Sequence, residues 1–136
     1  MATQRTKNRT ILARGFLGGA IASLVNAVIF LLARASEISF LLPAPAEGQD
    51  PIDLHVAGIV LSTLIPTLGA MLFMWLLNRY TRKPFTIFFI VALVVLALSF
   101  VPLTIDASMN TKVTLGAMHV VAAAGILGGF YSGYRS

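Results

Sequence analysis

Four apolar stretches, separated by shorter polar segments, dominate the pattern of residues along this chain. They cover residues 11–33, 54–78, 85–103 and 112–131. An α-helix needs about 20 apolar residues to cross the ~30 Å hydrocarbon core of a bilayer, and all four stretches approach or exceed that length. Within lipid each stretch has to be helical, because a helix satisfies all of its own backbone N–H and C=O groups. The pattern predicts an all-α membrane protein, a bundle of four transmembrane helices.

Composition supports this class. Hydrophobic residues make up 57% of the chain and charged residues only 11%, with a mean hydropathy of +0.87. A soluble domain carries about 25% charged residues, so this chain has too few to cover a water-facing surface. We expect a mobile basic tail over residues 1–10 and a single membrane domain over residues 11–136. The absence of cysteine excludes thiol catalysis, cysteine metal ligation and disulfides.

The charged residues sort onto two sides of the predicted bundle. Four crossings put both termini on one side, with eight of the ten basic residues: Arg5, Lys7, Arg9, Arg14, Arg79, Arg82, Lys83 and Arg135. The other side carries two basic residues and all five acids: Arg34, Lys112, Glu37, Glu47, Asp50, Asp53 and Asp106. Since basic residues accumulate on the cytoplasmic side, both termini are predicted to be cytoplasmic and the protein to lie in the cell membrane.

Four of the basic residues flank the membrane spans, and we expect them to lie against lipid headgroups: Arg14, Arg79, Arg82 and Lys83. They border apolar stretches instead of forming a basic face, which argues against a nucleic-acid partner. The first stretch also permits a second interpretation, because its basic start and Ala33-Arg34-Ala35 are typical of a cleaved signal peptide. Its 23 residues exceed the ~7–15 of a signal-peptide core, so an uncleaved helix is favoured.

Small residues predict which helices pack together. The first, second and fourth stretches carry Gly, Ala and Ser at helical spacing, whereas the third is almost entirely Val, Leu, Ile and Phe. Helices in lipid associate through small residues, so we expect the third to be the most exposed. Gly15-x-x-x-Gly19 is either a contact within one bundle, the favoured alternative, or a contact with another copy or another membrane protein. A short apolar run at residues 38–42 is expected to lie in the membrane interface.

One polar side chain in each stretch stands out: Asn26, Ser62, Ser99 and His119. All lie about 6–12 Å below the outer ends of their helices, at ~1.5 Å per residue. Polar groups inside a membrane are candidate functional residues, which predicts an outward-opening pocket that binds a ligand or responds to protons. The residues expected at its mouth are His55, Asp53 and Asp106. The alternative is that these groups only hydrogen-bond neighbouring helices, as Asn and Ser in membrane bundles usually do.

Enzyme and metal signatures are missing from the sequence. It contains no G-x-S-x-G, H-E-x-x-H or phosphate-binding loop. Its two histidines lack the further ligands, at the right spacing, that a zinc site requires, so no metal or cofactor is predicted. We expect a non-enzymatic protein, either a partner subunit or a binder of a small apolar or lipidic ligand. The alternatives are a small oligomeric transporter in which His119 responds to protons, and a membrane-embedded enzyme or a metal or haem protein.

The last apolar stretch carries the run Met118-His119-Val120-Val121-Ala122-Ala123. In this run, and weakly over all four stretches, the chain resembles small uncharacterised bacterial membrane proteins with four spans, a family of unknown function. The resemblance implies the four-helix fold and no particular activity. Small multidrug transporters are similar only in size and number of spans. They carry a carboxylate in the first helix, and no Asp or Glu lies inside any stretch here, so their proton exchange is not implied.

Overall fold

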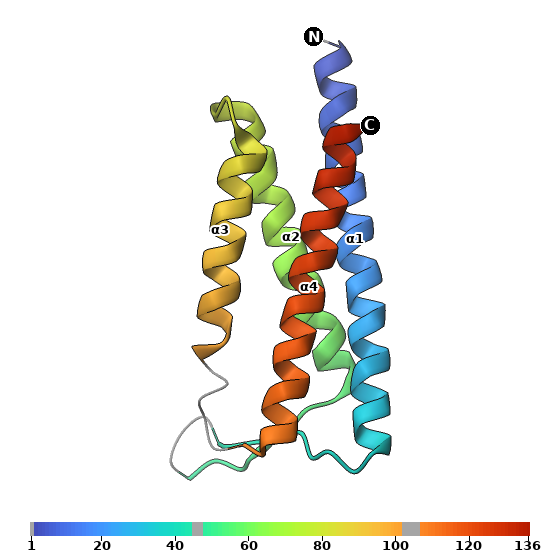
Figure 1. The fold of residues 1–136 in the computed structure, drawn as a ribbon, viewed down its shortest axis with the longest axis vertical. Coiled ribbons are helices and arrows are strands. Elements are labelled where there is room, and N and C mark those ends of the chain that lie inside the picture. The colour runs from blue at the N-terminus through green and yellow to red at the C-terminus, as the bar shows by residue number, and fades with distance from the viewer. Residues whose placement is uncertain (1, 45–47, 102–106) are drawn as a thin grey trace.

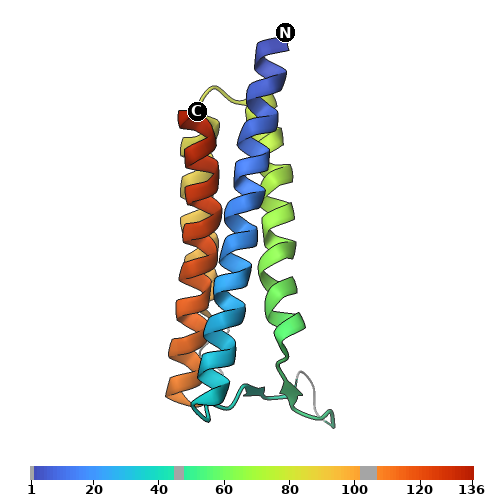
Figure 2. The ribbon, with the colours of Figure 1, turned by 90° about the vertical axis from the view of Figure 1, so that its right-hand side faces the viewer.

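The computed structural model describes residues 2–44, 48–101 and 107–136, with side chains from residue 7 onward. Within these residues the chain forms four long antiparallel helices: α1 (Ala2–Ala35), α2 (Val56–Tyr80), α3 (Pro84–Ser99) and α4 (Met109–Arg135). They run lengthwise along the molecule (Figure 1). Figure 2 shows α1 between α4 and α2, and α3 contacts α2 and α4 from the other side. The all-helical fold predicted from the sequence is confirmed.

Three of these helices, α1, α2 and α4, are long and apolar enough to cross a membrane. The fourth, α3, is equally apolar but has 16 residues, which is about 24 Å at ~1.5 Å per residue. It ends at Ser99 and not at the predicted residue 103. Pro102 follows closely in the sequence, and proline disfavours the helical conformation in the residue before it.

The N-terminal segment differs from the prediction. A mobile tail was expected over residues 1–10, but α1 is already helical from Ala2. Neither Gly nor Pro occurs between Ala2 and Arg14, so nothing interrupts the helix. Once the following turns are fixed by packing, adding further residues to an existing helix requires no new nucleation.

The closest helix contact joins α1 to α4 and depends on glycine. A Cβ atom on Gly18 would overlap the carbonyl oxygen of Gly125, and one on Gly129 would overlap the carbonyl oxygen of Arg14. The backbones therefore touch directly, as small residues permit in membrane helices. Gly15 and Gly19 of the predicted motif face Phe130 of α4 and Thr67 of α2, two residues of the same chain.

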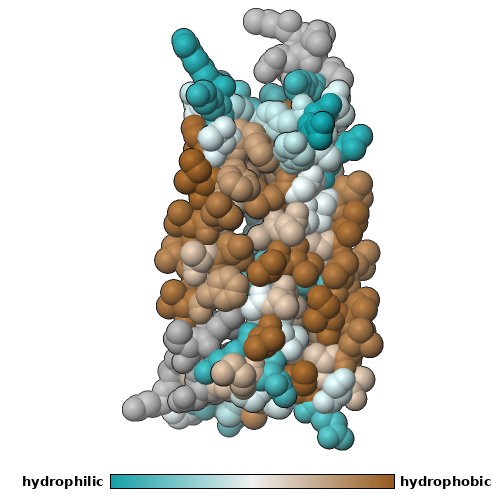
Figure 3. Space-filling model, viewed as in Figure 1, coloured by the Kyte–Doolittle hydropathy of each residue, from teal (hydrophilic) through white to brown (hydrophobic). Residues whose placement is uncertain are grey.

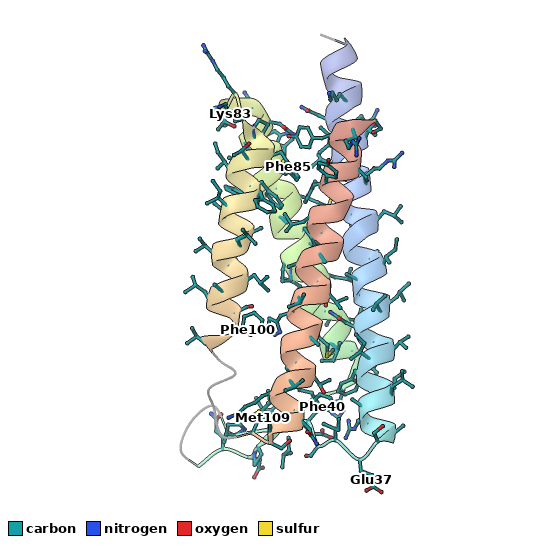
Figure 4. All side chains as sticks on the ribbon, in the orientation of Figure 1. Glu37, Phe40, Lys83, Phe85, Phe100 and Met109 are labelled. Atoms are coloured by element: carbon teal, nitrogen blue, oxygen red, sulfur yellow. The ribbon has the colours of Figure 1, made fainter. Side chains whose placement is uncertain are left out.

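The two ends of the bundle differ in charge. Both termini and the turn around Lys83 lie at one end, here called the basic end, whereas Glu37 and Met109 lie at the other, the loop end (Figures 1 and 4). Figure 3 shows a broad hydrophobic band between hydrophilic ends. The bundle therefore has the surface of a membrane protein.

Residues 36–44 and 48–55 form a cap over the loop end. Within the cap, β1 (Leu41–Leu42) pairs antiparallel with β2 (Ile52–Asp53), so α2 begins at Val56, two residues later than predicted. Phe40 is 1% exposed and its ring centroid lies 4.7 Å from that of Phe30 in α1 (Figure 4). This aromatic ring therefore fills the end of the helix bundle, and the expectation that residues 38–42 lie in the membrane interface stays a prediction.

Candidate functional site

A cavity of about 430 Å³, here called the main cavity, lies between α2, α3 and α4. Its walls are mostly apolar, and none of its described lining residues is Asp, Glu, Lys or Arg. It exists because α2 and α4 face each other diagonally and make few contacts. Small residues such as Gly69 and Ala123 line it, and a Cβ atom on Gly69 would meet nothing within 4 Å.

The main cavity has a polar end and an apolar end. Ser62, Ser99 and His119 line it toward the loop end, whereas Phe73 and Phe88 line it toward the basic end. Ser62 and Phe73 are eleven positions apart in the sequence, which corresponds to about 16 Å of helix at ~1.5 Å per residue. The cavity is thus long, with polar groups gathered at one end, which suits an amphiphilic molecule.

The main cavity opens sideways, to the surface that faces lipid. Among its lining residues, Ser62, Pro66 and Gly69 on α2 and Val91 and Val95 on α3 are exposed. Figure 3 shows the surface hollowed between α3 and α4. A molecule dissolved in the acyl-chain region could enter without passing through either hydrophilic end.

A second, smaller cavity adjoins the first and is here called the inner pocket. It has a volume of about 100 Å³ and lies between α1, α2 and α4. Four residues line both cavities: Ser62, Thr63, His119 and Ala122. The inner pocket is therefore a polar side chamber at the polar end of the main cavity.

Asn26 of α1 lines the inner pocket and is 2% exposed. Its Nδ2 donates hydrogen bonds to Thr63 Oγ1 of α2 at 3.2 Å and to the Met118 carbonyl oxygen of α4 at 3.0 Å. One side chain thereby joins three helices. Its Oδ1 is buried and has no hydrogen-bond partner in the described part of the chain.

His119 has a defined tautomer when it is neutral. Its Nδ1 lies 2.7 Å from the carbonyl oxygen of Leu115, and a carbonyl only accepts hydrogen bonds, so Nδ1 carries the proton. Nε2 of the neutral ring is then an acceptor. The imidazole also lies beside Phe100, with ring centroids 6.3 Å apart, so the last residues of α3 cover this side of the site.

The two serines use their protons within their own helices. Ser62 Oγ donates to the carbonyl oxygen of Ile59 at 2.8 Å, and Ser99 Oγ donates to that of Leu96 at 2.6 Å. Such bonds to the preceding turn are common for Ser and Thr in apolar helices. Each oxygen keeps lone pairs available to a ligand.

The four polar residues that stood out in the sequence are therefore brought together, in two adjoining cavities. Their role in binding a ligand or protons stays a prediction. Two of the residues predicted at the mouth of the pocket lie elsewhere. Asp53 forms an exposed ion pair with Arg34 at 2.9 Å, and His55 occupies the N-cap position of α2. Neither lines either cavity, and Asp106 lies outside the described residues.

The basic residues expected at the headgroups are all exposed: Arg14, Arg79, Arg82 and Lys83. The guanidinium of Arg79 lies 5.8 Å from the Trp75 ring centroid and 5.6 Å from that of Tyr80. Aromatic and basic side chains thus gather at the basic end, as at a membrane–water interface.

Sequence reasoning missed Thr63 and Thr67, which are 3% and 0% exposed. They lie one turn apart on the face of α2 that meets α1, where Thr63 receives the Asn26 bond and Thr67 packs on Gly19. Threonine in an apolar run attracts little notice, because its methyl group and its bond to the preceding turn suit a membrane helix. The available signal was that a buried Asn26 requires a partner.

No three His, Asp or Glu side chains are grouped as metal ligands within residues 2–44, 48–101 and 107–136. The two cavities therefore offer a ligand hydrogen-bonding groups and apolar surface.

Comparison with known proteins shows the family to which the chain belongs. No curated protein and no solved structure matches the chain. A family of unknown function, DUF6069, matches residues 6–135 and so includes all four helices together with both cavities. The resemblance to a family without an assigned activity is thereby confirmed: this chain belongs to the family of unknown function DUF6069.

Proposed function

We propose that this protein is a non-enzymatic membrane protein that binds a small apolar or lipidic ligand in the main cavity. The observation that carries the proposal is a cavity of about 430 Å³ with apolar walls and polar groups at one end. Ligand sites are typically clefts of about 300–1,000 Å³ with apolar walls and few polar groups. The sideways opening suits a ligand that reaches the site from the bilayer.

The membrane arrangement is part of the proposal. All four helices cross the cell membrane, and the basic end lies in the cytoplasm, because most of the Lys and Arg residues gather there. The short α3 spans with the help of local bilayer thinning, which costs fractions of a kcal/mol per Å of mismatch. Its first residue, Pro84, follows Lys83 at the basic end, and Met109 begins α4 at the loop end (Figure 4). The polar end of the main cavity then lies in the outer half of the membrane.

The hydroxyl groups support a binding role over hydrolysis. An activated serine needs a base within hydrogen-bonding reach. Ser62 and Ser99 instead donate to carbonyl oxygens of their own helices, and His119 Nδ1 bonds Leu115. These groups are arranged to line a site and not to activate a nucleophile.

Photolabelling tests the proposal. The protein is placed in lipid nanodiscs with a diazirine-bearing alkane, irradiated, and digested so that labelled residues can be mapped by mass spectrometry. We expect saturable labelling on the segments of α2, α3 and α4 that line the main cavity. Labelling of residues that merely face lipid should rise in proportion to the probe.

A matched pair of variants supplies the control. Ala123 lines the main cavity, whereas its neighbour Ala124 is exposed and lines neither cavity. Ala123→Phe fills the cavity and should abolish the saturable component, and Ala124→Phe should leave it unchanged. Labelling that never saturates, or that responds equally to both substitutions, would show that the main cavity holds no ligand.

A further inference from the structure

The polar groups around the inner pocket have used their hydrogen-bond donors. Asn26 Nδ2 donates to Thr63 Oγ1 and to the Met118 carbonyl oxygen. Thr63 Oγ1 donates in turn to the carbonyl oxygen of Ile59 at 3.3 Å, and His119 Nδ1 bonds Leu115. Each of these donors already faces a protein acceptor, so a ligand finds none of them free.

Hydrogen-bond acceptors remain on three residues that line the inner pocket. Asn26 Oδ1 is buried without a partner in the described part of the chain. A buried acceptor left without a donor costs free energy, and such groups normally have a partner. His119 Nε2 is an acceptor in the neutral ring, and Ser62 Oγ keeps its lone pairs. The residues around the pocket therefore supply acceptors, and a ligand would supply the donor.

The charges of the lining residues restrict which chemical group of the ligand can be that donor. None of the described residues that line either cavity is Asp or Glu, so a buried ammonium group would have no counter-ion. Burying an unpaired charge is far more costly than burying a hydroxyl group that is hydrogen-bonded. A carboxylate would be rejected for a second reason, because it can only accept hydrogen bonds and the pocket offers acceptors.

We propose that the ligand is a neutral amphiphile with a hydroxyl head, of the long-chain alcohol class. Its hydroxyl group lies in the inner pocket and donates to His119 Nε2. Its hydrocarbon chain extends through the main cavity toward Phe73 and Phe88. This inference rests on the proposed function, since it names the chemical class of the ligand in the same cavity.

Geometry supports this orientation. Ser62, Thr63, His119 and Ala122 line both cavities, so a head group and its chain can occupy the two spaces together. Phe30 and Phe40, each 1% exposed, pack in one cluster with Ile59 and Met118, two residues that line the inner pocket. The chain of the ligand therefore extends into the main cavity. Water is the competing occupant, because the inner pocket has room for it and water also donates hydrogen bonds.

Competition against the photoactivatable alkane tests the inference. Unlabelled dodecane, dodecanol, dodecylamine and dodecanoate are compared at equal mole fractions in the nanodisc bilayer. Dodecanol should displace the probe at about a fivefold lower mole fraction than dodecane, as one net hydrogen bond implies. Dodecylamine and dodecanoate should compete no better than dodecane.

Variants of His119 locate the hydroxyl group. The readout is the ratio of the half-displacing mole fractions of dodecane and dodecanol. His119→Leu should lower this ratio severalfold, and His119→Gln should restore it, because the glutamine amide oxygen is again an acceptor. Thr114→Val on the same helix is the control and should keep the wild-type ratio, because Thr114 bonds its own helix and lines neither cavity.

The outcomes separate the two proposals. Saturable labelling with equal competition by dodecane and dodecanol would leave the main cavity a ligand site and overturn the hydroxyl head, with water in the inner pocket. Stronger competition by dodecylamine than by dodecanol would also overturn it, in favour of a cation. Absence of saturable labelling in the wild-type protein would reject the proposed function itself.

Discussion

Asn26 shows at the scale of one residue why a polar group persists inside an apolar bundle. It bonds α2 through Thr63 and α4 through Met118, and its Oδ1 is buried without a partner in the described part of the chain. Its role could be partly predicted, because asparagine in an apolar run is conspicuous. Its partners could not, since they lie 37 and 92 residues away along the chain.

Replacing Asn26 should weaken the bundle. Asn26→Leu removes two interhelical hydrogen bonds, each worth ~0.6 kcal/mol on average, so we expect a loss of about 1 kcal/mol in the free energy of unfolding. Ser99→Ala removes a bond within one helix and should change it by less than about 0.5 kcal/mol. Reversible unfolding in mixed detergent micelles measures both. Equal effects of the two substitutions would contradict the interhelical role of Asn26.

Glycine at position 18 should be required for the α1–α4 contact. Gly18→Ala places a methyl group against the backbone of Gly125, which cannot move aside as a side chain can. We expect a loss of about 1–3 kcal/mol from overpacking. Gly128→Ala lies in open space on α4 and should be neutral or stabilise by up to ~1 kcal/mol, as alanine is the better helix former. The same detergent titration tests the pair, and a tolerated Gly18→Ala would mean that the helices are not in backbone contact.

At the scale of elements, the cap differs most from its expectation. The four apolar stretches located the helices, but the loop at residues 36–44 and 48–55 offered only composition. The structure uses it to close the loop end: Leu54 N–H bonds the Phe40 carbonyl oxygen at 3.2 Å, and Thr111 Oγ1 of α4 donates to the Ser39 carbonyl oxygen at 2.6 Å. An aromatic residue in a loop can face lipid, water or protein with similar local conformations, so its burial depends on the hole left by neighbouring helices.

Removing the Phe40 ring should open that end. Phe40→Ala deletes a fully buried aromatic side chain and should cost about 3–5 kcal/mol of stability. Leu41→Ala, at the next position but 52% exposed, should change stability by no more than about 0.5 kcal/mol. Thermal unfolding in detergent distinguishes them. A small effect at Phe40 would mean that the cap is not part of the core.

In the whole molecule, the distribution of charge and the arrangement of the helices both distinguish the same two ends. The termini and the turn around Lys83 share one end, as an even number of crossings requires, and the cap lies at the other. A fourth crossing depends on α3, whose 16 residues are few for a span. Lys83 directly precedes α3 and Met109 begins α4, so the sides of the membrane on which these two residues lie decide the topology.

Cysteine labelling tests that topology directly, because the native chain contains no cysteine. Met109→Cys and Gln49→Cys should react on intact cells with a membrane-impermeant maleimide. Lys83→Cys and Ser136→Cys should react only after permeabilisation. Labelling of Lys83→Cys and Met109→Cys from the same side would show that α3 does not cross the membrane.

The class of the protein, the approximate course of its helices and the ends to which its charges belong could all be predicted from the sequence. These properties follow from hydropathy and from the local backbone, and each can be read within one stretch of the chain. The contact between Gly18 and Gly125, the position of Phe40 at the loop end, and the cavity between α2 and α4 became known from the folded structure. Those features depend on how side chains from distant stretches fit against one another, and hydropathy carries no information about that fit.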